Sequence, residues 1–132
     1  MGSGTYKLAK VIEGRMHYAE VTVSVEFGGG SAVELSPSLF AWLKDEYGPN
    51  AWEWPACEDF RKAALSGAEF ALRQMAGHDG VPAARVVVNE IRATLADTAP
   101  DDVARATMCA VWQALGVDRA RFSQWIDERK GP

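Results

Sequence analysis

The sequence has 132 residues, of which 48% are hydrophobic and 24% charged, with a formal net charge of −4 at pH 7. This length suits one folded domain with a hydrophobic core, and the composition is that of an ordinary globular protein. No segment is strongly basic, and no apolar run reaches the roughly 20 residues that cross a bilayer, so neither DNA nor membrane is an expected partner.

The N-terminal residues have no signal-peptide pattern, which predicts a cytoplasmic protein. Met1–Gly4 is expected to be disordered or a remnant of a cloning vector, and residues 5–132 are expected to form a single α+β domain. Two cysteines, Cys57 and Cys109, lie in separate predicted helices. In a reducing compartment we interpret them as two buried small hydrophobic residues.

Three strands are predicted in the first part of the chain. Residues 5–13 carry Tyr6, Leu8 and Ile12 on one face, and residues 17–27 alternate strictly between apolar and polar side chains. Such alternation is typical of a strand with one face on a core and one in water. Three consecutive glycines then predict a turn before a short strand at 32–35. We expect these strands to form an antiparallel meander.

Helices are predicted after the third strand. Ser36-Pro37 has the signature of a helix start, and the short helix that follows carries Leu39, Phe40 and Leu43 on one side. Pro55 precedes a long helix at 56–76, whose apolar stripe consists mostly of small residues. A helix with such a stripe can pack very close to a sheet.

A strand at 85–97 is predicted to lead through a tight turn into a helix at 101–115. Asp101 and Asp102 are interpreted as residues that stabilise the helix N-terminus. Asn89 interrupts the apolar pattern of the strand. It marks either a bulge or pocket that aims a side chain, or simply one partly buried amide, and we favour the second interpretation. Asp118 is expected to cap a final helix that buries Phe122 and Ile126.

Together these elements predict an α+β two-layer sandwich: a mainly antiparallel four-stranded sheet with helices packed on one face. The apolar positions shared by the two layers form the expected core, which includes Val21, Val23, Val25, Phe60, Ala64, Ala68, Ile91, Leu95, Val103 and Ala110.

The order of elements and several short motifs resemble a known family. The motifs are Gly14 followed by HYAEV at 17–21, ALSGAEFAL at 64–72, and the strand 85–97 followed by DDVA at 101–104. They resemble domain IV of translation elongation factor G, which has the fold of the second domain of ribosomal protein S5. The resemblance implies an unusual left-handed connection between parallel strands. It also implies contact with the ribosome or RNA through loops at 14–17 and 97–100.

No catalytic motif is present in the sequence. A G-x-x-x-x-G-K-[ST] phosphate loop is missing, so the protein is not expected to be a GTPase. His17 and His78 are interpreted as exposed loop residues, because no nucleophile is placed beside them. Neither cysteine has a neighbouring Cys or His, so no metal and no cofactor is expected.

The candidate contact residues are Trp52, Trp54, Arg15 and His17. The two indoles could anchor a partner or cover one end of the sheet. We expect a non-catalytic interaction module that binds a protein partner or a second copy of itself. The alternatives are a translation-linked domain that binds RNA or the ribosome, and a small-molecule-binding or enzymatic domain with an unrecognised pocket.

Overall fold

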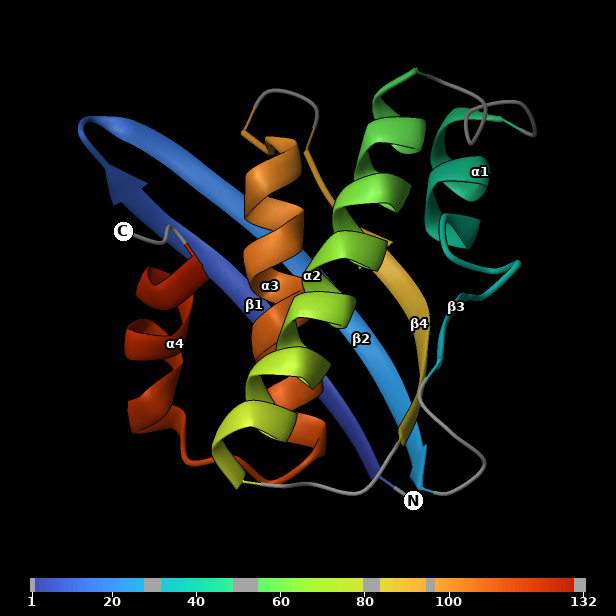
Figure 1. The fold of residues 1–132 in the computed structure, drawn as a ribbon. Coiled ribbons are helices and arrows are strands. Elements are labelled where there is room, and N and C mark those ends of the chain that lie inside the picture. The colour runs from blue at the N-terminus through green and yellow to red at the C-terminus, as the bar shows by residue number, and fades with distance from the viewer. Residues whose placement is uncertain (1, 28–31, 49–54, 80–83, 95–96, 130–132) are drawn as a thin grey trace.

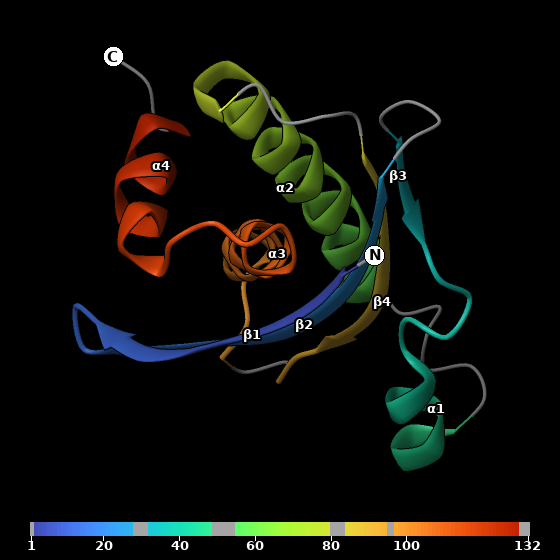
Figure 2. The same ribbon diagram turned by 90° about the horizontal axis from the view of Figure 1, so that it is seen from below.

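The computed structural model describes residues 2–27, 32–48, 55–79, 84–94 and 97–129, and it has the expected α+β architecture (Figure 1). Figure 2 shows two layers, with α2, α3 and α4 on one side of the sheet and α1 beyond its β4–β3 edge. The elements in chain order are β1 (Gly2–Ile12), β2 (Arg15–Phe27), β3 (Ala32–Leu35), α1 (Ala41–Tyr47), α2 (Pro55–Asp79), β4 (Ala84–Arg92), α3 (Pro100–Ala114), η2 (Arg119–Arg121) and α4 (Phe122–Arg129).

The strand order is β1-β2-β4-β3, so the expected meander of the first three strands is wrong. β1 and β4 pair antiparallel with the two sides of β2, whereas β3 pairs parallel with β4. The reason lies in the length and burial of the strands. β4 carries three fully buried apolar residues, Val86, Val88 and Ile91, and takes the central position beside β2. β3 has four residues and none of them is buried, so it lies at the edge.

The connection between the parallel strands β3 and β4 is left-handed. In Figure 1 the helices face the viewer, β3 and β4 both run upward, and α2 runs downward in front of them. The chain meanwhile moves from β3 on the right to β4 on its left. Most parallel connections have the opposite hand. The left-handed connection is the one that the resemblance to the elongation factor domain implied.

The inner face of β2 forms the floor of the core. Ala19, Val21, Val23 and Val25 have no exposed surface, as the alternation predicted. Phe27, which follows the same alternation, is instead 51% exposed at the strand end. All the predicted core residues that the structure describes are buried; Leu95 lies outside the described residues.

A bulge interrupts the pairing of β2 with β4. Thr22 pairs with Glu90 and Val23 pairs with Val88, so Asn89 is the extra residue on β4. The bulge changes the face of the strand: Val86 and Val88 point into the core before it, and Ile91 points there after it. The Asn89 side chain donates a hydrogen bond to Ser24 Oγ at 2.6 Å. Asn89 therefore both marks a bulge and is a partly buried amide with a hydrogen bond to a neighbouring strand.

Several elements begin or end where the sequence did not predict; α2, for example, continues to Asp79 rather than ending at residue 76. β1 begins at Gly2, so Gly2–Gly4 is an ordered part of the sheet. β4 ends at Arg92 rather than Asp97. α1 begins at Ala41 rather than Pro37, because Ser36 Oγ accepts a hydrogen bond from the Ser38 amide and residues 37–40 form turns.

α3 is the central helix, and every residue from Asp102 to Trp112 except Arg105 is buried. It contacts β1 and β2 on one side and α2 on the other. Glycines permit this approach. A Cβ at Gly4 would lie 2.4 Å from the Ala110 carbonyl oxygen, and a Cβ at Gly67 would lie 2.5 Å from that of Ala104. Any side chain at either position would push backbone atoms apart.

We predict that Gly4→Ala and Gly67→Ala each lower the free energy of unfolding by about 1–3 kcal/mol, because the new methyl group meets backbone oxygen that cannot rotate away. Urea unfolding followed by circular dichroism measures the change. Ser3→Ala, at an exposed β1 position, is the control and should have little effect. Unchanged stability of both glycine variants would show that α3 can shift without cost.

Candidate functional site

A cavity of about 430 Å³ lies between α1 and the start of α2, beyond the end of β4. We call it the α1–α2 pocket. Cavities of a few hundred Å³ with mainly apolar walls are typical ligand-binding sites. Most of its lining residues are aromatic or aliphatic, and the polar ones include Glu46, Arg92 and Thr94. The full lining consists of Tyr18, Phe40, Trp42, Leu43, Glu46, Cys57, Phe60, Arg92, Ala93 and Thr94.

Backbone contacts hold α1 against the free edge of β4. The Ile91 amide donates to the Leu39 carbonyl oxygen at 3.1 Å, and the Trp42 indole donates to the Ile91 carbonyl oxygen at 2.6 Å. The Arg92 guanidinium lies 6.0 Å from the centre of the Trp42 ring and pairs with Glu90. The indole and the guanidinium at this rim are therefore held by groups of the protein.

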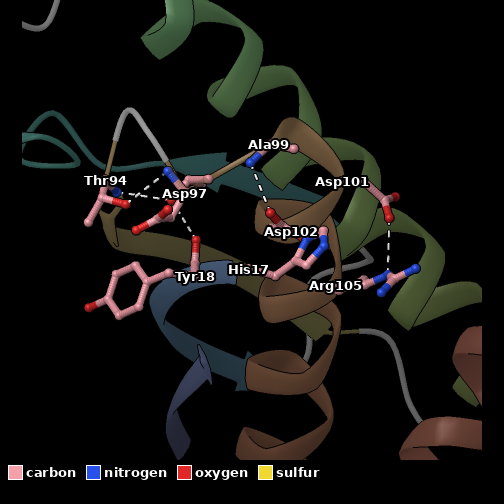
Figure 3. A network of polar contacts seen from close by, with 9 residues as sticks. His17, Tyr18, Thr94, Asp97, Ala99, Asp101, Asp102 and Arg105 are labelled. Atoms are coloured by element: carbon pink, nitrogen blue, oxygen red, sulfur yellow. Dashed lines mark hydrogen bonds and ion pairs between the residues drawn. The ribbon is translucent and has the colours of Figure 1, made fainter. Parts of the chain in front are cut away.

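A compact turn of polar contacts forms the neighbouring corner of the molecule (Figure 3). The amide of Asp97 donates to the carbonyl oxygen of Thr94, and the Thr98 hydroxyl accepts from the Thr94 amide. Tyr18 joins this turn to β2: its amide donates to the Asp97 carbonyl oxygen at 3.1 Å, and its carbonyl oxygen accepts from the Thr98 hydroxyl. The contacts explain why β4 does not continue to Asp97 as predicted.

The most buried charged group among the described residues is Asp102, in the first turn of α3. Its side chain is 3% exposed, and Oδ1 lies 2.8 Å from His17 Nδ1. Oδ2 accepts a hydrogen bond from the Ala99 amide at 2.9 Å, which is one half of a capping box. An ionised carboxylate only accepts hydrogen bonds, so His17 donates through Nδ1. The pair joins β2 to the N-terminus of α3 (Figure 3).

The structure describes two of the four predicted contact residues, His17 and Arg15. His17 is not an exposed loop residue: it belongs to β2, is 22% exposed and pairs with Asp102. Arg15 is the first residue of β2 and is exposed. Trp52 and Trp54 lie outside the described residues, as does the side chain of His78. A role of these residues in binding a partner remains a prediction.

Cys57 and Cys109 are buried and form no disulfide, in agreement with the interpretation of the sequence. Burial raises the pKa of Cys57, although the nearby Arg61 opposes the shift. Burial likewise raises the pKa of Cys109 to about 12, against the opposing charges of Arg119, Lys10 and Arg105. Thiols with raised pKa values are poor nucleophiles at neutral pH.

Among the described residues, no group of three or more His, Cys, Asp or Glu side chains is placed to hold a metal ion. No helix in the described part of the chain is long and apolar enough to cross a membrane. The sequence had drawn attention to neither Trp42 nor the contact between His17 and Asp102, which are 85 residues apart. A signal for Trp42 was present, since it lies within the apolar run of Leu39, Phe40 and Leu43.

We predict that His17→Ala lowers the free energy of unfolding by about 1–3 kcal/mol, because the Asp102 carboxylate would lose its side-chain partner while staying buried. In the background of Asp102→Asn the same substitution should cost less. Urea unfolding of the two single variants and the double variant measures the coupling, which we expect to be at least about 0.5 kcal/mol. Fully additive effects would contradict a specific interaction.

We predict that Cys109 makes the protein less stable as the pH rises above about 9. The unfolded thiol loses its proton near its ordinary pKa of 9.0, whereas the folded thiol keeps it up to about 12. The unfolded state then binds fewer protons, which favours unfolding. The stability difference between the wild type and Cys109→Ala, measured by urea unfolding, should shrink between about pH 8 and about pH 10. A difference that does not vary with pH would contradict the raised pKa.

No protein-family model matches the sequence, and no curated protein is similar to it. Among solved structures, the chain is similar to the crystal structure of ttk003000868 from Thermus thermophilus, with a TM-score of 0.60 and 15% sequence identity. The match covers 85% of this chain and 15% of the other chain, so this chain spans only a small part of its structural neighbour. At this identity the similarity shows a shared fold and nothing more.

Proposed function

We propose that this domain is a non-catalytic protein interaction module whose α1–α2 pocket receives an apolar side chain of the partner. The observation that carries the proposal is the character of the pocket. Its volume is about 430 Å³, and aromatic or aliphatic side chains, among them Phe40, Trp42 and Leu43, form most of its wall. Pockets of this kind hold the central anchor residues of protein interfaces, which contribute most of the binding energy.

The polar groups at the rim support an anchoring role. The Trp42 indole is bound to the Ile91 carbonyl oxygen and Arg92 is paired with Glu90, so neither must be desolvated without a partner when a ligand enters. A buried polar group left unpaired would cost affinity. Thr94 Oγ1 already accepts a hydrogen bond from the Asp97 amide. An apolar side chain can therefore displace water from the pocket without breaking these bonds.

The charges near the His17 corner support a protein partner over RNA. The carboxylate of Asp102 is buried against His17, and Asp101 lies within ion-pair distance of Arg105. Arg15 is exposed, but Asp97 lies in the same corner. The corner thus has near-balanced charge, whereas proteins that bind nucleic acid through the phosphate backbone need an excess of positive charge. Because the sequence resembles the elongation factor domain, RNA binding is the alternative that the experiment must exclude.

The proposal is tested by selecting displayed random peptides on the immobilised wild-type domain. We expect the selected peptides to share a large apolar residue, since one such side chain fills the pocket. Ala93→Phe, which fills the pocket from within, should reduce their affinity by about tenfold or more in fluorescence polarisation. The matched control is Ala9→Phe, the same change at an exposed position of β1, which should leave binding unchanged.

Light scattering determines whether a second copy of the chain is the partner, in which case Ala93→Phe should convert a dimer to a monomer. Peptides that bind Ala93→Phe as well as the wild type would overturn the pocket as the anchor. Micromolar binding of a fluorescent RNA that weakens steeply with salt, by a domain that selects no peptides, would replace the proposal with the RNA alternative.

A further inference from the structure

A second, smaller cavity is lined by residues of β1, α3 and α4. Figure 2 shows α4 on the side of the molecule opposite α1. The volume of the cavity is about 160 Å³, which suits one small chemical group. It combines hydroxyl, thiol and charged side chains from three elements, and two of the charged side chains are cations. Lys10 comes from β1, Arg105 and Cys109 from α3, and Ser123 from the first turn of α4.

Three cations act on this cavity from different elements. Lys10 and Arg105 are part of its wall, and Arg119 of η2 is close enough for its charge to act, with theirs, on the thiol of Cys109. Arg119 lies over the Tyr6 ring, with Cζ 5.2 Å from the ring centre. Within the described residues, no carboxylate lies within ion-pair distance of Lys10 or Arg119. Lys10, in the cavity wall, is therefore available to a ligand, and Arg119 adds positive charge nearby.

Arg105 has an unsatisfied polar atom. Its Nε lies 3.0 Å from Asp101 Oδ2, yet the atom is buried and makes no hydrogen bond. The contact with Asp101 is thus electrostatic and poorly aligned. Asp101 therefore offsets part of the Arg105 charge without making a hydrogen bond to this atom. Arg105 is the one residue with such a side-chain atom among those that the structure describes.

Two carboxylates oppose this positive charge. Asp127 of α4 is part of the cavity wall and exposed, and Asp101 is half exposed beside Arg105. The three cations therefore exceed the carboxylates by one charge. An anion that enters the cavity meets the hydroxyl of Ser123 as well as the cations. Hydrogen bonds between such donors and phosphate oxygens are among the strongest in proteins, and arginine is the preferred partner.

We propose that this cavity binds a single phosphate group, either as inorganic phosphate or as the phosphate monoester of a small molecule. Lys10 of β1 and Arg105 of α3 supply charge and donors, and Ser123 adds a neutral donor. Arg119 adds a longer-range attraction. The site is separate from the α1–α2 pocket and does not depend on the interaction function proposed above. It is also too small for a nucleic-acid backbone, so a free strand would not occupy it.

The test titrates inorganic phosphate into the ¹⁵N-labelled domain and follows the amide resonances, with chloride at matched ionic strength as the reference. We expect saturable shifts at Cys109 and Ser123 in the millimolar range or below. Lys10→Gln and Arg105→Gln should each weaken phosphate binding by about tenfold. The matched control is Lys7→Gln, since Lys7 is exposed on the same strand with its Nζ 5.9 Å from the Tyr18 ring, and it should not change the affinity.

Two further ligands test whether the site accepts a phosphate monoester or the phosphates of a nucleic acid. Glycerol 3-phosphate, a monoester, should produce the same shifts as inorganic phosphate, whereas a short RNA should not compete with it. Shifts equal to those in chloride, or an equal loss in Lys7→Gln and Lys10→Gln, would overturn the proposal because they reflect general screening. Lys10 is exposed, so Lys10→Gln stays informative if Arg105→Gln folds poorly.

Discussion

The architecture depends on how closely the backbone of α3 approaches its neighbours. At Gly4 and Gly67 an added Cβ would lie 2.4 and 2.5 Å from a carbonyl oxygen of α3, so only glycine fits. Because β1 and α2 both come this close, α3 is enclosed and its residues from Asp102 to Trp112 are buried, apart from Arg105. A helix enclosed to this extent must be apolar over most of its circumference, and the alanines, valines and Trp112 of α3 satisfy this requirement.

Burial of α3 has a consequence for its N-terminus. The first turn needs acceptors for its free amide groups, and Ala99 cannot supply one from its side chain. Asp102 accepts the Ala99 amide instead, which brings a carboxylate into the interior. A buried carboxylate requires a second partner, and His17 of β2 provides it. The polar corner is thus a product of the same close packing that forms the core.

The central position of α3 also affects where cavities can form. The two cavities described above lie at the margins of the core between the sheet, α2 and α3, one beside α1 and one beside α4. α1 is attached to the β4 edge through backbone atoms of Ile91, and its aromatic side chains leave an apolar pocket. α4 rests on Tyr6 and Trp112 through Phe122, and the gap near Lys10 is lined by charged groups. The two margins differ in chemistry because different residues border them.

The fold class, most elements and the core could be predicted from local patterns in the sequence. The alternation of Ala19 to Val25 identified a half-buried strand, and the small residues around Gly67 indicated close packing, because these signals depend only on neighbours in the chain.

Contacts between distant segments became visible only in the folded chain. The position of β4 between β2 and β3 and the pairing of His17 with Asp102 each join segments that are far apart in sequence. The two cavities were likewise not predictable from the sequence, because their walls come together only after the sheet and helices have packed. Periodicity reports which face of an element is apolar, but it carries no information about which other element will cover that face.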